Sequence, residues 1–180
     1  MVRAAKLDSS LYEEVEKDAT ATNQALLVVV IASIAAGIGA GIQGHIAVGL
    51  TGFVSSLIIG VIGALVSWFI WSFITYFIGT RLFKGPQTQS TYGELLRCIG
   101  FSASPKTLEF LVFIPLVGPI IAFLAMLWSL VAMVIAVRQA LDFTTGRAIA
   151  TCIVGFIVMV IIAAIIGALT AGLIVLTRMG

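Results

Sequence analysis

Charged side chains are scarce in this chain of 180 residues. Only 10% of the residues are charged and 61% are hydrophobic, whereas an ordinary soluble domain has about 25% charged residues. So little charge excludes a soluble globular domain, and so much apolar sequence excludes a disordered chain. A net charge of +2 is also too small to indicate a nucleic-acid partner. The remaining class is an integral membrane protein, with membrane lipids as its first partners.

Residues that carry catalysis or bind metals are equally scarce. His45 is the one histidine, so every catalytic triad and every multi-histidine metal site would depend on it. Cys98 and Cys152 are the only cysteines, and they lack the paired spacing of metal ligands, so we expect buried free thiols. The sequence therefore predicts a protein that is not an enzyme and has neither metal nor cofactor. Ligation of a haem or a chlorophyll-type pigment by His45 stays open as an alternative.

Long blocks without charge predict the membrane-spanning helices. A span needs about 20 residues, so the uncharged block between Asp18 and Arg81 holds two of them. We place them at 25–41 and 53–78, with a glycine-rich break at 42–52 between them. Two more uncharged blocks predict spans at 118–137 and 148–177.

Residues 94–114 form a weaker fifth candidate that contains charged side chains. A charge at the bilayer centre costs about 2.5–3.5 kcal/mol on insertion scales. Lys106 and Glu109 are three residues apart, so they could form a buried ion pair on one helical face. Arg97 lies near the segment's start and could extend to the interface, and Pro105 would kink the helix. A re-entrant half-helix, with four full spans, is the fallback.

The positions of the basic residues favour five membrane segments. Arg81 and Lys84 lie in the loop after the second span, and loops rich in Lys and Arg stay in the cytoplasm. With five segments, Arg138 and Arg147 also fall on that side, whereas four segments would place them outside. The predicted fold is therefore an all-α transmembrane bundle of five segments with a proline-kinked third segment and a cytoplasmic amino terminus.

Residues 1–22 are predicted to form a cytoplasmic amphipathic helix before the transmembrane domain, 23–180. Ser10 could cap this helix, since Glu13 stands in the capping-box position three residues later. Leu7, Leu11 and Val15 recur every four residues and give the helix an apolar stripe. We expect the helix to lie at the cytoplasmic face of the membrane or to dock on a partner.

Small residues at four-residue spacing predict close helix packing. Such residues let helix backbones approach one another in lipid. The positions are Gly37, Gly41 and Gly60 in the first two spans, and Ala163, Gly167 and Ala171 in the last. This packing could be internal to the bundle, or it could leave a helix face for another subunit. The last span is the best candidate for the second case.

Trp128 falls at the middle of the span at 118–137. Its indole N–H has no water there, so we expect it to donate a hydrogen bond inside the bundle. Contact with a lipid tail or a quinone is an alternative. Lys106 and Glu109, beside a broken helix, could also belong to a transport path.

Two stretches carry a resemblance to a known family. STYGELLRCIGFSASP at 90–105 and LWSLVAMVIAVRQALDFTTGRAIA at 127–150 resemble the Ypt/Rab-interacting (YIP) family of membrane proteins. The resemblance implies five spans and a cytoplasmic amino terminus. The short amino terminus is similar to that of prokaryotic members, which implies the plasma membrane. The residues that match the family pattern are Tyr92, Glu94, Leu95, Arg97, Gly100, Phe101, Pro105, Trp128, Arg138, Gly146 and Arg147.

The leading interpretation is a non-catalytic membrane protein that acts by helix–helix contact. It would be a structural or accessory subunit, or an organiser, of a larger membrane protein complex, including an energy-transducing one. Other integral membrane proteins are the expected partners, and a homo-oligomer is a further option. One alternative is a small transporter or channel that uses Lys106 and Glu109. Another is a membrane-organisation or trafficking factor, as the resemblance to eukaryotic YIP relatives implies.

Overall fold

The chain folds into helices that lie along one another at membrane-spanning length. A computed structural model describes residues 1–85, 88 and 90–179, without the side chains of 43–48, 171–176 and 178–179. This part of the chain contains no strand, and the predicted all-α transmembrane bundle is confirmed. The elements are α1 (Val2–Ala5), α2 (Ser9–Lys17), α3 (Ala21–Arg81), α4 (Tyr92–Ser102), η1 (Ser104–Phe113), α5 (Gly118–Ala140) and α6 (Thr145–Met179).

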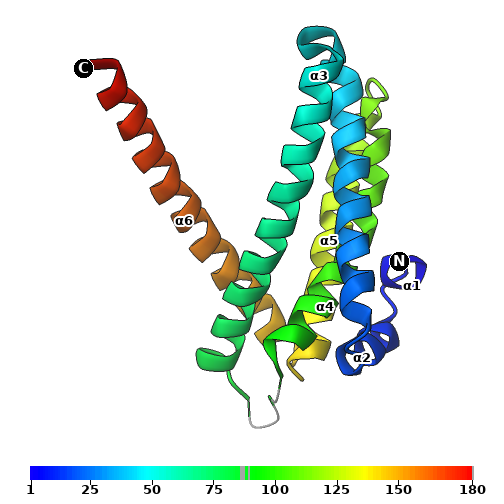
Figure 1. The fold of residues 1–180 in the computed structure, drawn as a ribbon. Coiled ribbons are helices and arrows are strands. Elements are labelled where there is room, and N and C mark those ends of the chain that lie inside the picture. The colour runs from blue at the N-terminus through cyan, green and yellow to red at the C-terminus, as the bar shows by residue number, and fades with distance from the viewer. Residues whose placement is uncertain (86–87, 89, 180) are drawn as a thin grey trace.

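Helix α3 contains both of the first two predicted spans and reverses direction at its middle (Figure 1). Gly49 has φ 64° and ψ 177°, a conformation that glycine adopts readily because it has no Cβ. The two halves lie antiparallel and touch at the predicted glycine pair. A Cβ on Gly37 would lie 2.6 Å from Cδ1 of Leu57, and one on Gly41 would collide with the Phe53 ring. This glycine pair therefore packs inside the bundle.

The third segment consists of two different helices. Helix α4 ends at Ser102, and the 3-10 helix η1 begins at Ser104 with Pro105 in its first turn. Proline has no N–H to donate and disfavours the α conformation of the residue before it. The predicted proline-kinked third segment is thus interrupted at the proline, where the chain changes from α to 3-10 geometry.

Together α4 and η1 are long enough to cross a bilayer. At 1.5 Å per α residue and 2.0 Å per 3-10 residue, they reach about 36 Å, against roughly 30 Å of hydrocarbon. They run along the bundle beside α3 and α5 (Figure 1). Four other stretches are long and apolar enough to span a membrane as single helices: Ala21–Ile42, Gly49–Arg81, Gly118–Ala140 and Thr145–Thr170.

The inner face of α5 consists of small residues. Ala125, Ser129, Ala132 and Ala136 are buried, and their spacing of three or four places them on one helical face. Trp128 stands beside that face and is 41% exposed. The expectation that its indole N–H donates inside the bundle is therefore wrong, because the closely packed inner face has room only for small side chains.

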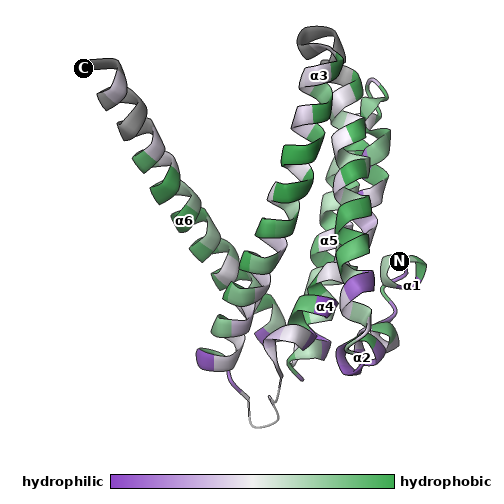
Figure 2. Ribbon diagram, in the orientation of Figure 1, coloured by the Kyte–Doolittle hydropathy of each residue, from purple (hydrophilic) through white to green (hydrophobic). Residues whose placement is uncertain are grey.

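Helix α6 leaves the bundle. It touches α3 near Gly155, where a Cβ would lie 3.5 Å from the Trp71 ring and 3.8 Å from Oγ1 of Thr75. Beyond this contact the two helices diverge and form a V (Figure 1), and both arms are predominantly hydrophobic (Figure 2). From Val160 to Thr170 every side chain of α6 is exposed. The free arm of α6 is thus an apolar helix without a packing partner along that stretch.

Candidate functional site

Helix α2 packs on the same end of the bundle as the start of α4. Its N-cap is Asp8, whose Oδ1 accepts from the backbone N–H of Ser10 at 3.1 Å, so the predicted cap at Ser10 is wrong. Asp8 is the N-cap because its carboxylate can accept hydrogen bonds from the free N–H groups of the first turn. Leu11 and Val15 of the predicted apolar stripe are buried together with Tyr12. Leu7 lies outside the helix with φ 60°.

Arg97 of α4 holds the last turn of α2. It is 8% exposed, its Nε donates to the carbonyl of Val15 at 2.9 Å, and its Nη2 donates to the carbonyl of Glu16. The last carbonyls of a helix lack partners within the helix and carry partial negative charge. The guanidinium of Arg97 donates to two of these carbonyls. These hydrogen bonds offset the free-energy cost of burying its charge. Arg97 therefore binds protein rather than extending to the interface.

Two further contacts join α2 to its neighbours. The thiol of Cys98 donates to the carbonyl of Tyr12 at 3.5 Å, and Nε2 of Gln139 donates to Oε1 of Glu13 at 2.9 Å. The prediction of buried free thiols is confirmed for Cys98, whereas Cys152 is a free thiol that is only half-buried. Helix α2 thus docks on α4 and α5 of its own chain.

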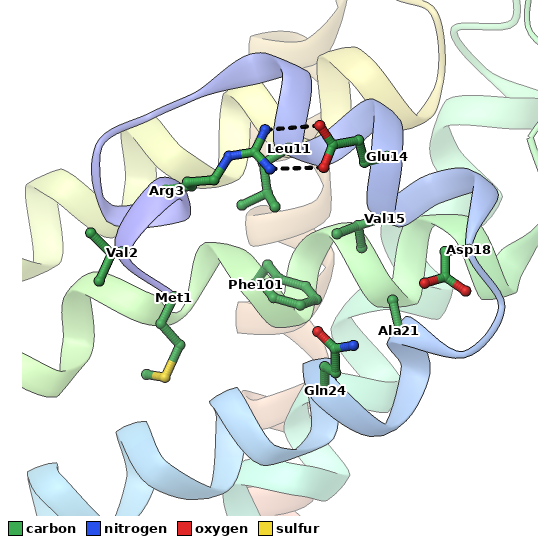
Figure 3. A pocket seen from close by; sticks show the side chains of 10 residues that line it. All are labelled: Met1, Val2, Arg3, Leu11, Glu14, Val15, Asp18, Ala21, Gln24 and Phe101. Atoms are coloured by element: carbon green, nitrogen blue, oxygen red, sulfur yellow. Dashed lines mark hydrogen bonds and ion pairs between the residues drawn. The ribbon is translucent and has the colours of Figure 1, made fainter.

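A groove of about 460 Å³ lies between α1, α2, the start of α3 and α4 (Figure 3). Arg3 reaches across it to Oδ2 of Asp8 and Oε2 of Glu14, at 2.8 Å each. Hydrogen bonds from Ser10 and Arg3 lower the pKa of Asp8 to about 2. The groove floor includes the buried ring of Phe101. The charged groups at its rim, Arg3, Asp8 and Glu14, pair with one another through Arg3. The groove therefore offers an apolar surface rather than a reactive group.

Glu16 is the carboxyl whose titration this packing changes most. Its side chain is half-buried, and burial followed by the charges of Asp142 and Glu94 raises its pKa from 4.5 to about 7. Lys17 opposes this shift, and Glu13 adds to it. The proton is therefore held more tightly in the docked state than in a released one.

Docking of α2 is expected to weaken as the pH rises. A raised carboxyl pKa means that the docked state binds more protons than the released state between pH 4.5 and about 7, so its stability falls through that window and levels off above it. Proteolysis of the 9–17 segment at pH 5 and pH 8 measures this, and cleavage should be faster at pH 8. Glu16→Gln should remove the difference, whereas Glu14→Gln, at an exposed carboxyl, should leave it in place.

The predicted buried ion pair between Lys106 and Glu109 does not form. Lys106 is exposed and Glu109 half-buried, and the ion pairs found in the described region all involve Arg3. The two residues still share a side of η1, since residues three apart lie above one another in a 3-10 helix. Among the described residues, the charged groups of Lys106 and Glu109 do not come within ion-pairing distance of each other.

The structure brings part of the family pattern together in α4. Glu94 closes a capping box with Thr91, Leu95 and Phe101 are buried, and Gly100 packs against Ala25 and Trp68. A Cβ on Gly100 would lie 2.8 Å from that of Ala25. The other members, Trp128, Arg138, Gly146 and Arg147, lie on α5 and α6 rather than in this cluster, while Tyr92, Arg97 and Pro105 lie in or just after α4.

Several packing contacts carry no signal in the sequence. The indole N–H of Trp68 donates to the carbonyl of Leu96 at 3.0 Å, and the hydroxyl of Tyr92 donates to the carbonyl of Phe69 at 3.0 Å. A Cβ on Gly39 would collide with the carbonyl oxygen of Glu109. These three contacts fix α4 and η1 against α3. A tryptophan, a tyrosine and a glycine within apolar runs do not reveal which carbonyl they approach.

Three of the predicted packing positions face open space. A Cβ on Gly60 or Gly167 would meet nothing within 4 Å, and Ala163 is exposed. The side chains of Ala171 and His45 lie outside the described residues. Where side chains are described, no group of three His, Cys, Asp or Glu is placed to hold a metal ion.

One comparison with known proteins finds a match, and that match is to a family model. The family model described as the Yip1 domain matches residues 9–173, which confirms the resemblance seen in the sequence and covers nearly all elements from α2 to α6. Neither the curated proteins nor the solved structures contain a match. With its apolar spanning helices, the chain is an integral membrane protein, and it belongs to the Yip1 domain family.

Proposed function

We propose that this protein is a non-catalytic membrane protein that works by contact, as a structural or accessory subunit of a larger membrane complex. The observation that carries the proposal is the free arm of α6. From Val160 to Thr170 this arm packs against no other part of the described chain, and it presents Ala163 and Gly167. Small residues on a spanning helix allow the backbone of another helix to approach closely. The facing half of α3 presents Gly60 in the same way.

The charge distribution supports a cytoplasmic amino terminus, while the prokaryotic plasma membrane follows only from the resemblance of the short amino terminus to prokaryotic members. Arg81, Lys84, Arg138 and Arg147 lie at or next to the helix ends on the side where α2 docks, and Lys and Arg are retained on the cytoplasmic side. Helix α2 then belongs to the cytoplasmic face. Because it docks on its own chain, the partner surface lies in the membrane rather than on α2.

Photo-crosslinking from the free arm of α6 tests the proposal. A photoreactive residue at Ala163 or at Gly167 is expected to form adducts with another polypeptide in intact cells, detected by mass spectrometry. The matched control is the same residue at Ala132, which is fully buried on α5 and should give no such adduct. Adducts with lipid alone at both α6 positions would show that the arm faces only the bilayer, and would overturn the proposal.

A further inference from the structure

Positively charged residues from two distant segments meet where α3 ends and α6 begins. Arg81 is the last residue of α3, Lys84 follows in the loop, and Arg147 lies in the first turn of α6. The Arg147 guanidinium lies on the backbone of Gly85, where a Cβ would collide with it. All three cationic side chains are exposed. We call these three residues the basic corner.

Among the described residues, no carboxylate forms an ion pair with the basic corner. The sequence has no Asp or Glu from 19 to 93, and none after Asp142. The nearest acidic residues along the chain are Glu94 and Asp142. Their charges raise the pKa of Glu16, which lies at the α2 side of the bundle. In the part of the chain with described side chains, ion pairs form only at Arg3. The three cationic groups of the basic corner therefore lack an ion-pairing carboxylate in the described part of the chain.

The basic corner borders a hollow that continues onto an apolar surface. The hollow has a volume of about 470 Å³ and is lined by Tyr76, Thr80, Arg81 and Lys84. Phe73 and Phe77 are exposed on the same side of α3, one turn or more closer to the bundle middle. Tyrosine rings favour the level of the headgroups, and phenylalanine is stable in the hydrocarbon. The end of α3 therefore presents three features in order. The cations of the basic corner come first, then the polar hollow, then the apolar surface of Phe77 and Phe73.

We propose that the basic corner binds the phosphate of an anionic phospholipid from the leaflet at this end of the bundle. A phospholipid is favoured over free phosphate because its acyl chains would cover the exposed Phe73 and Phe77, which free phosphate would leave uncovered. Each Lys or Arg near an anionic membrane surface contributes about fivefold in affinity. Removing two members of the corner should therefore weaken binding about 25-fold.

Native mass spectrometry of the full-length protein in detergent tests this site. Phosphatidylglycerol and phosphatidylcholine are titrated separately, and bound lipids are counted. The wild type should prefer phosphatidylglycerol, and Lys84→Gln/Arg147→Gln should lose about 25-fold in affinity for it. The control Lys6→Gln/Lys17→Gln removes the same charge from the α1–α2 side and should stay within about twofold of the wild type.

Three results would overturn the assignment. The first is equal binding of the two lipids by the wild type, and the second is an equal loss in the control variant. The third comes from inorganic phosphate titrated alone: binding as tight as that of phosphatidylglycerol would show that the acyl chains contribute nothing. If the double variant does not fold, Arg81→Gln provides the same test at an exposed position and should lose about fivefold.

Discussion

Replacing Gly39 with leucine is expected to destabilise the bundle by about 3 kcal/mol. A Cβ at this position would collide with the carbonyl oxygen of Glu109 and would lie 3.0 Å from that of Phe110. Both obstacles are backbone atoms of η1, which cannot rotate away as a side chain can. The substitution should therefore push η1 from α3 and loosen the third segment. Unfolding by a denaturing detergent, followed by circular dichroism, measures the loss.

The matched control for Gly39 is Gly60, which lies on the other half of the same helix. A Cβ at Gly60 would meet nothing within 4 Å, so the Gly60→Leu variant should be as stable in isolation as the wild type. The same variant could still weaken contact with a partner, which separates folding from association. Equal destabilisation by the two substitutions would contradict the packing of η1 against α3.

Arg97→Met is expected to release α2 from the bundle. Two hydrogen bonds from the guanidinium to the carbonyls of Val15 and Glu16 would be lost. Bonds that involve a charged group contribute about 1.5–3 kcal/mol each, so docking should weaken by about 3 kcal/mol or more. Hydrogen exchange of the amides in 9–17 should become faster by two orders of magnitude or more, since each 1.4 kcal/mol corresponds to about tenfold.

Arg81→Met serves as the control for Arg97, because Arg81 is an exposed arginine at the end of α3, and no hydrogen bond or ion pair to α2 is found for it among the described residues. It should leave exchange in 9–17 unchanged. Arg97→Lys should restore only part of the protection, since an ammonium group lacks the fork that reaches two carbonyls at once. Full protection in Arg97→Met would show that the buried apolar side chains of α2 suffice for docking.

The membrane helices could be predicted from the sequence because charge is costly in hydrocarbon. Uncharged blocks placed four spans close to where the structure has them, and the break at 42–52 contains the reversal at Gly49. The capping box formed by Thr91 and Glu94 also depends on neighbouring residues, so the start of α4 can be predicted from the sequence. These features depend on residues that are near one another in the chain.

The candidate surfaces could not be predicted because they depend on contacts between distant residues. Arg97 meets a carbonyl 82 residues away, and nothing in its local sequence indicates burial. Trp128 faces outward because the small residues beside it occupy the packed face of α5. The small-residue pattern is similar in α3 and α6, yet Gly37 packs inside the bundle and Gly167 does not. Only the direction of α6 in space separates these two cases.

If the free arm of α6 binds another membrane polypeptide, the particle released from its own membrane should be heavier than one chain. The protein is extracted from that membrane into polymer-bounded lipid discs, without detergent, and its protein mass is measured by native mass spectrometry. We expect a protein mass above the 19.0 kDa of one chain, with a second membrane polypeptide or another copy present. A uniform population of single chains of 19.0 kDa would contradict it.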